Sequence, residues 1–272
     1  MIGAKDIRVE RIDSRDAARI IRAVHYSGAV VASSQLHFGV FAGGRCGGAM
    51  SFGPPLDKRK SAGLVRGTSW ENFCELNRMA FADWLPRNSE SRALGVAFRW
   101  FRKHAPEVRW IQSFADATQC GDGAIYRASG FELVRIKRNH DLFEVPGFGV
   151  VHKMTLTLAR PSRVQATMRE AAGMPTASPQ RVVRALGGRP LPGWQVLYVR
   201  FLDPSWRERL TVPVLPFAKL DELGVRMYRG QRIARADSDP VDTLGVQPRE
   251  GGSTPTSALH SDGEACLDDW LA

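Results

Sequence analysis

The stretch from Asn72 to Phe131 combines strand and helix patterns in an order that constrains the fold more than any other part of the chain. Apolar runs at 70–81 and 110–114 predict two strands, and an apolar face at 94–101 predicts a helix between them. Two strands that bracket a helix are typical of a βαβ unit. Because ligands bind at the carboxyl ends of the strands in such units, we expect functional residues there.

Further strands lie on both sides of this unit. We expect them at residues 5–12, 36–41, 46–52, 131–137 and 151–158, with loops at 57–68 and 140–149. A helix after the first strand is capped by Asp13 or Ser14, and the turn between the second and third strands is Gly43-Gly44. The order predicts an α+β fold with a mixed, mostly antiparallel sheet that is flanked by helices.

The distribution of charge divides the chain into three parts. The net charge is +10, and residues 1–159 carry 23 Lys and Arg against 15 Asp and Glu, whereas residues 160–235 carry 14 against 5. Residues 236–272 carry 1 against 8 and are rich in Ser, Gly and Pro. We therefore expect a main domain at 1–159, a basic C-terminal appendage packed on it at 160–235, and an acidic disordered tail at 236–272.

The basic body favours a polyanionic partner, although Arg-rich coding also produces basic proteins. No apolar run approaches the ~20 residues of a membrane span, and the N-terminus lacks the apolar region of a signal peptide. The four cysteines are widely spaced and form no C-x-x-C motif, which is typical of reduced thiols. These features predict a cytoplasmic protein, with no membrane partner, that binds a polyanion such as a nucleic acid.

Several polar residues at element ends are candidates for a site. Asp116 follows the strand at 110–114 and either points into a ligand crevice or begins a turn. Arg78 lies near the end of the preceding strand, where it contacts a ligand or pairs with Glu75. His25 and Tyr26 stand at the end of the first helix, where capping and packing are their ordinary roles.

Four motifs together resemble the Mom family of phage DNA-modification proteins. They are His25-Tyr26-Ser27, Glu75-Leu76-Asn77-Arg78, Ser113-Phe114-Ala115-Asp116 and Tyr126-Arg127-Ala128-Ser129-Gly130-Phe131. The resemblance covers roughly residues 5–158 and continues more weakly to 230. It implies a fold similar to the GCN5-related N-acetyltransferases, here with a C-terminal appendage, and a reaction on the exocyclic N6 amine of adenine. The added carbamoylmethyl-type group would protect phage DNA from host restriction inside the bacterial cell.

The resemblance also implies a set of site residues. His25, Tyr26 and Asp116 would hold iron (Fe2+), with His37 or His152 as further candidates, and Arg78 would be functional. Tyr126 would lie near the thiol of a coenzyme A thioester such as acetyl-CoA, as a general acid. The turn before the main helix carries no Gly, unlike the acetyltransferase pattern, but Asn88, Ser89 and Ser91 remain candidates to bind the cofactor's phosphates.

An enzyme that acts on this amine must extrude the base or use unpaired DNA. The basic segment at 57–68 either contacts phosphate or is simply solvated, and Tyr26, Trp70 and Trp84 are candidates to stack on the base. Two alternatives remain open: a conventional acyl-CoA-dependent N-acetyltransferase, and a non-catalytic DNA-binding protein of the same fold. A homodimer is compatible with each of these functions.

Overall fold

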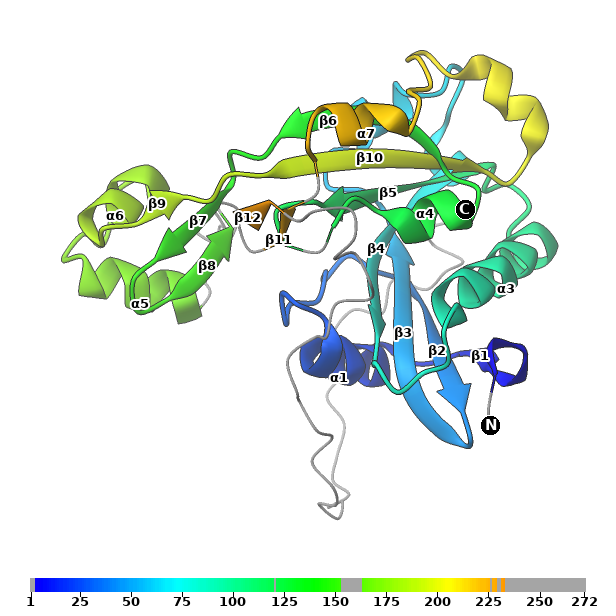
Figure 1. Ribbon diagram of the computed structural model, residues 1–272, viewed down its shortest axis with the longest axis horizontal. Helices are drawn as coiled ribbons and strands as arrows, with labels where there is room; N and C mark the ends of the chain where they lie inside the picture. The colour runs from blue at the N-terminus through cyan, green and yellow to red at the C-terminus, as the bar shows by residue number, and fades with distance from the viewer. Residues whose placement is uncertain (1–2, 120, 153–162, 226, 229–230, 233–272) are drawn as a thin grey trace.

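A computed structural model describes residues 3–119, 121–152, 163–225, 227–228 and 231–232. Its main feature is a seven-stranded sheet in the order β1-β2-β3-β4-β5-β10-β6 (Figure 1). The strands are β1 (Arg8–Arg11), β2 (Leu36–Ala42), β3 (Arg45–Gly53), β4 (Phe73–Phe81), β5 (Trp110–Asp116), β6 (Glu132–Arg138) and β10 (Trp194–Phe201). All neighbours pair antiparallel except β4 and β5, which are parallel. The predicted α+β class with a mostly antiparallel sheet is therefore confirmed.

Two helices cover opposite faces of this sheet. Helix α1 (Ser14–Val24) packs against Ala49 and Ala80, while α3 (Ser89–His104) packs on the cluster that contains Met50. Ala49 and Met50 are consecutive in β3, so their side chains point to opposite faces. The short α4 (Ala124–Ala128) lies on the α3 side. We name the two sides the α1 face and the α3 face.

Local chemistry explains where α1 begins. The Asp13 carboxylate accepts a hydrogen bond from the backbone N–H of Asp16 at 2.7 Å, which satisfies a donor that the first helical turn leaves open. Ala17, Ile20 and Ile21 then form the buried stripe of the helix. Of the two residues that the sequence offered as the cap, the structure selects Asp13.

The last strand of the main sheet corrects the predicted domain boundary at 159. Strand β10 lies between β5 and β6 and pairs with both, so part of the expected appendage at 160–235 belongs to the sheet of the first domain. The sequence predicted strands at 131–137 and 151–158, but it did not predict that the first of them pairs with a strand beyond residue 159. Periodicity identifies a strand but contains no information about which distant strand it pairs with.

The segment between β6 and β10 forms a small lobe (Figure 1). It contains β7 (Leu142–Val145), β8 (Gly149–His152), β9 (Arg189–Pro190), α5 (Arg163–Ala171) and α6 (Pro179–Ala185). The lobe has its own apolar core, which includes Val145, Val151 and Met168. The predicted loop at 140–149 therefore contains β7, while residues 153–158 of the predicted strand lie outside the described residues.

The other basic segment also departs from prediction, because α2 (Lys58–Ala62) forms within the expected loop at 57–68. The remaining elements are η1 (Ala4–Asp6), η2 (Trp70–Asn72), η4 (Pro204–Arg209), α7 (Ala218–Glu222), β11 (Met227–Tyr228) and β12 (Gln231–Arg232). The predicted acidic tail at 236–272 lies outside the described residues. Within the described part of the chain, no helix is both long and apolar enough to cross a membrane.

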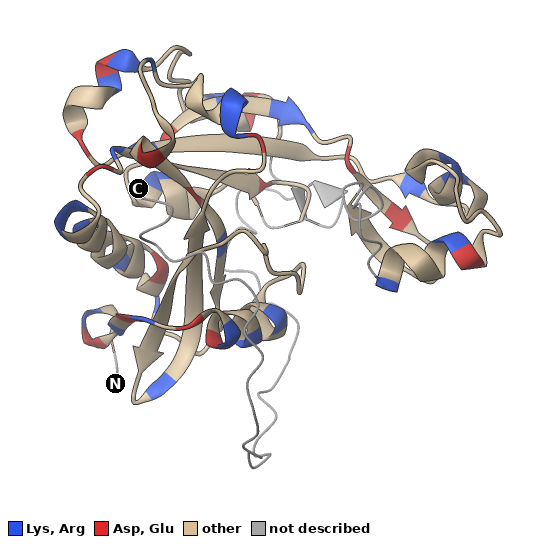
Figure 2. Ribbon diagram, turned by 180° about the vertical axis from the view of Figure 1, so that it is seen from behind, with Lys and Arg blue, Asp and Glu red and all other residues tan. Residues whose placement is uncertain are grey.

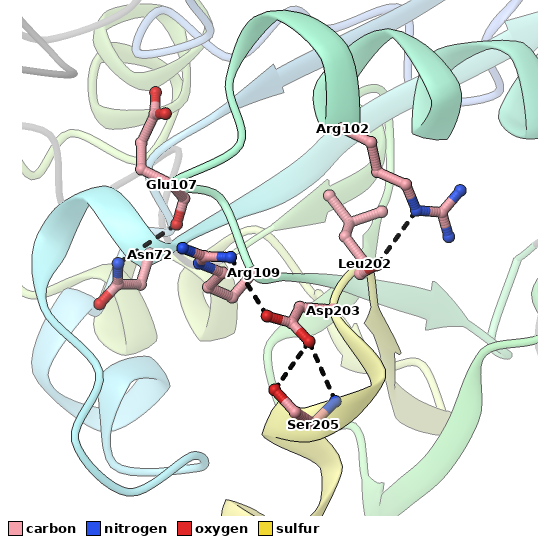
Figure 3. Close-up of polar contacts among 7 residues, drawn as sticks. All are labelled: Asn72, Arg102, Glu107, Arg109, Leu202, Asp203 and Ser205. Carbon is pink, nitrogen blue, oxygen red and sulfur yellow. Dashed lines mark hydrogen bonds and ion pairs between the residues drawn. The ribbon is translucent and has the colours of Figure 1, made fainter.

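An ion pair and two hydrogen bonds hold the chain at the amino ends of the parallel strands β4 and β5 (Figure 3). Arg109 forms an ion pair with Asp203 at 3.1 Å, and the side chain of Asn72 donates to the Glu107 carbonyl at 3.2 Å. Arg102, from α3, donates to the carbonyl of Leu202 at 3.0 Å, just after β10. The two strands are thus fixed at their amino ends, and any divergence between them falls at their carboxyl ends.

Candidate functional site

Strands β4 and β5 separate at their carboxyl ends. Their parallel pairing runs from Phe73 with Trp110 to Leu76 with Ser113 and stops there, although β4 continues to Phe81 and β5 to Asp116. Backbone groups in the separated halves lack the partner strand that the paired halves have. A gap at the carboxyl ends of parallel strands is the expected position of a ligand site.

A β-bulge marks the point of separation. Ser51 of β3 pairs with Arg78 and the next residue, Phe52, pairs with Leu76, so Asn77 is the extra residue in β4. Bulges bend a strand and redirect its side chains, and they are common beside active sites. The bulge here explains how β4 turns away from β5 after Leu76.

Four polar side chains meet at this bulge. Asn77 accepts a hydrogen bond from Ser34 Oγ at 2.9 Å and donates to Glu75 Oε1 at 3.3 Å, and Gln112 Nε2 donates to Glu75 Oε2 at 2.6 Å. Cys74, Leu76 and Ile111 belong to the core on the α3 face, so alternation places Glu75 and Gln112 on the α1 face. We call Ser34, Glu75, Asn77 and Gln112 the β4–β5 cluster.

The electrostatics of this cluster are unusual for an interior. Burial raises the pKa of Glu75, and the hydrogen bonds from Gln112 and Asn77, together with the charge of Arg78, oppose that rise. Gln112 is 1% exposed and its Oε1 has no hydrogen-bond partner within the described structure. A buried acceptor without a donor costs free energy.

Arg78 fixes a loop above the cluster. Its Nε donates to the Ala29 carbonyl at 2.9 Å and its Nη1 to the Asn77 carbonyl at 2.8 Å. A Cβ atom on Gly53 would lie 2.6 Å from the Ser33 carbonyl oxygen, so the loop lies directly against the end of β3. We call residues 25–35 the His25 loop. The forked guanidinium of Arg78 thus holds this loop on the bulge, and its predicted role in catalysis stays a prediction.

His25 begins this loop at the end of α1. Its backbone N–H donates to Ile21, its ring lies 4.2 Å from the Tyr26 ring between centroids, and its Nδ1 accepts from the backbone N–H of Ser27 at 3.1 Å. Burial, and then the nearby charge of Arg78, lower the pKa of His25 to about 4. The ring is therefore neutral at pH 7, and because Nδ1 accepts, its proton lies on Nε2.

Asp116 ends β5 on the same face as Gln112, since Ala115 and Ala117 belong to the opposite core. Its Oδ1 accepts from the Thr118 backbone N–H at 3.0 Å, and its Oδ2 accepts from Gln119 at 3.2 Å. These contacts correspond to the turn role that the sequence left open. His25 and Asp116 share the α1 face, and their convergence on one site stays a prediction.

The predicted iron ligands do not form a prepared metal site. Nδ1 of His25 and both oxygens of Asp116 are engaged by neighbours in their own loops. Of the two further candidates, His37 lies 2.8 Å from Ser51 Oγ, and His152 ends β8 in the lobe. Across the described ranges, no group of three or more His, Cys, Asp or Glu side chains could hold a metal ion. The donor arrangement therefore does not fit iron as it stands.

Tyr126 lies on the α3 face, in the core rather than beside His25. Its ring contacts Phe131 and Tyr198 at centroid distances of 5.3 and 5.2 Å, and its hydroxyl donates to the Phe114 carbonyl at 3.5 Å. The Tyr126 ring therefore has the packing role that the sequence left open as an alternative. The proposed acid role of the hydroxyl stays a prediction.

The turn before α3 is tighter than its sequence suggested. Asn88 has a φ of 67°, a left-handed conformation that Gly adopts freely and that Asn tolerates. The hydroxyls of Ser89 and Ser91 donate to the carbonyls of Pro86 and Asn88. These side chains are thus used within the turn, so they do not fit the predicted role of holding coenzyme A phosphates.

Sequence reasoning did not identify Ser34, Asn77 and Gln112, and it treated Glu75 only as a possible partner of Arg78. The signal was nevertheless present, because Glu75, Asn77 and Gln112 are polar residues within strands that are otherwise apolar. A polar residue in a buried strand requires partners, and the structure shows that these residues supply them to one another.

Comparison with known proteins identifies the family of this chain. A model of the Mom protein family matches residues 6–219, from the first strand to α7, and the chain belongs to this family. It is 34% identical over 221 residues to the methylcarbamoylase Mom of Escherichia phage Mu, a match that covers 80% of this chain and 86% of that protein.

Solved acetyltransferases are also similar at low sequence identity. The ribosomal-protein-S18-alanine N-acetyltransferase of Escherichia coli is 12% identical, with a TM-score of 0.40, and the match covers 72% of this chain and 94% of that protein. An acetyltransferase of the GNAT family from Streptococcus pneumoniae is 12% identical, with a TM-score of 0.38, over 72% and 98%.

Proposed function

We propose that this protein modifies DNA by transferring a carbamoylmethyl-type group to the N6 amine of adenine. The observation that supports this most is the relationship to the phage Mu methylcarbamoylase, which extends over 86% of that protein. The family match at residues 6–219 includes the whole β4–β5 cluster. We further propose that the modification protects phage DNA from restriction in the host cell.

The chemistry of this target suits the surroundings of the cluster. The adenine amine must leave the duplex, and its Watson–Crick edge presents one donor and one acceptor. The unpaired Oε1 of Gln112 offers an acceptor, and the proton on His25 Nε2 offers a donor. Tyr26, a residue that is 43% exposed and whose ring lies beside that of His25, offers a surface for stacking. We propose that these three side chains bind the extruded base.

Arg78, Asp116 and Tyr126 have supporting roles in this proposal. Arg78 holds the His25 loop in place, and Asp116 orders the turn after β5 at the carboxyl end of the gap. The Tyr126 hydroxyl lies on the other side of β5, where a group donor would enter from the α3 face. A coenzyme A thioester is the donor class to test first, held at its phosphates by the backbone N–H groups of the first turn of α3 rather than by serine hydroxyls.

Double-stranded DNA is the partner that the charge supports. Figure 2 shows Lys and Arg on several elements of the body, including α1, α3 and β6. The net charge of the whole chain is +10 despite its acidic C-terminal end. Such a surface attracts a polyanion over distances comparable with the Debye length, about 10 Å at moderate salt.

The direct test is nucleoside mass spectrometry of plasmid DNA from cells that express the protein. We expect a nucleoside heavier than deoxyadenosine by the carbamoylmethyl-type group. His25→Ala and Asp116→Ala should abolish it while the variants remain folded. His104→Ala is the matched control, since His104 ends α3 and stacks on Trp100 at 5.0 Å, away from the His25 loop. Unmodified deoxyadenosine with the wild-type protein would contradict the proposal.

A further inference from the structure

Leu56 extends into solvent between a pair of prolines and a capped helix. Its residue surface is 82% exposed, the largest value among the exposed large apolar residues of the described chain. Pro55 before it is buried, and Pro54 precedes that. Asp57 after it caps α2 by accepting from the backbone N–H of Lys60 at 3.1 Å. Single exposed leucines are ordinary on protein surfaces, but this one stands between a proline pair and a capped helix, so little entropy is lost when it is held.

Three basic residues follow Asp57, which pairs with Lys60 at 3.3 Å, and the first of them lies beside an exposed aromatic ring. Lys58, Arg59 and Lys60 are all exposed, and the Lys58 ammonium lies 6.0 Å from the centre of the Trp70 ring. Trp70 is itself 52% exposed. This combination of ammonium and guanidinium groups with apolar surface complements a nucleic acid, whose phosphates and bases require both.

Leu56 follows shortly after a residue that lies against the β4–β5 cluster. Gly53, the last residue of β3, is so close to the His25 loop that an added Cβ atom would lie 2.9 Å from Asn77 Oδ1. Leu56 is three positions after Gly53, a span of at most about 10 Å. The exposed Val30 is an equal number of residues from Ser33, on the other side of the same junction. Leu56 and Val30 are therefore exposed apolar residues in the two segments that meet at Gly53.

An enzyme that extrudes a base leaves a gap in the stack, and apolar side chains that enter between base steps are a common way to fill it. We propose that the segment 54–60 is a DNA-binding element in which Leu56 enters the duplex where the target base leaves, while Lys58 and Arg59 bind the adjacent phosphates. The identity of the target base rests on the proposed function. The contact between segment 54–60 and duplex DNA does not rest on it.

Duplex DNA with 2-aminopurine in place of adenine tests the role of Leu56, because its fluorescence rises when the base is unstacked. We expect the wild-type protein to raise the fluorescence and Leu56→Ala to bind without that rise. Leu223→Ala, at an exposed leucine on the end of α7, is the matched control and should behave as wild type. A rise that persists with Leu56→Ala, or that is absent with the wild-type protein, would overturn the proposal.

The phosphate contact is tested by the salt dependence of binding to the same duplex, measured by fluorescence anisotropy. Lys58→Ala should reduce the slope of log affinity against log salt by about 1. Lys219→Ala removes an equal charge that is paired with Glu222 at 2.6 Å, and it should leave the slope unchanged. Equal slopes for the two variants, or no binding of wild-type protein to duplex DNA, would overturn the assignment of this surface.

Nucleoside analysis of plasmid DNA separates this inference from the proposed function. Modification by the wild-type protein and its loss in Leu56→Ala would support both. Full modification by Leu56→Ala would overturn the role of Leu56 and leave the function intact. If the wild-type protein modifies nothing, the proposed function fails, and the fluorescence and anisotropy results still decide whether the segment 54–60 binds and opens duplex DNA.

Discussion

The hydroxyl of Ser34 donates a hydrogen bond to Asn77 Oδ1 across 2.9 Å, and this bond joins the His25 loop to the bulge in β4. The same Asn77 side chain donates to Glu75, so the position of the loop and the position of a buried carboxylate depend on one residue. Because Asn77 joins the bulge, the loop and the carboxylate, a substitution at one of these contacts should also affect the other two.

Asn77→Ala should lower the free energy of unfolding by about 1–3 kcal/mol, because it removes the partner of Ser34 and one donor to Glu75. Chemical denaturation measures the change. Ser34→Ala should lower it less, and the double variant should show a coupling of about 0.5–1.5 kcal/mol. Strictly additive effects would mean that the bond between the loop and the bulge contributes nothing.

Gly53→Ala should destabilise the protein and displace the His25 loop. The new Cβ atom would lie 2.6 Å from the Ser33 carbonyl oxygen and 2.8 Å from the Ser34 Cα, and both are backbone atoms that cannot rotate away. Gly95→Ala is the control in α3, where the nearest atom would be the end of Arg99 at 3.8 Å. It should raise stability by up to about 1 kcal/mol through helix propensity. Thermal denaturation should give shifts of opposite sign for the two variants.

Glu75 should make stability fall as the pH rises. Its folded pKa lies above its ordinary value of 4.5, because burial disfavours the charged carboxylate. The native state therefore retains a proton that the unfolded chain has lost, and the free energy of unfolding decreases from about pH 4.5 up to the raised pKa. Glu75→Gln cannot titrate, so its stability relative to wild type should increase across this window and then level off. A difference that is constant with pH would contradict the raised pKa.

Deletion of residues 236–272 should keep or raise affinity for duplex DNA. The segment carries 1 basic and 8 acidic residues, so its removal leaves a more positive protein. Affinity of both forms should fall steeply with added salt, as counterion release requires. Anisotropy titrations at two salt concentrations measure this. Loss of DNA binding on deletion would place the binding surface in the tail instead of the body.

The sequence by itself determined the elements and much of their placement. Asp13 before an apolar stripe located the start of α1, Gly43-Gly44 located the first hairpin, and the pattern of residues 72–131 located the parallel pair β4 and β5. These are local properties, since caps, turns and periodicity depend on residues a few positions apart. The motifs around His25, Arg78 and Asp116 likewise identified the family, because they are contiguous in sequence.

Only the tertiary structure decided which distant segments meet. It placed β10 between β5 and β6, ended the pairing of β4 with β5 at Leu76, and brought Ser34 to Asn77 across 43 residues of chain. Strand pairing and bulge position depend on the register between segments that are far apart, which no local pattern specifies. For the same reason, the buried partners of Glu75 became apparent only when Gln112 was placed beside it by the parallel register of the two strands.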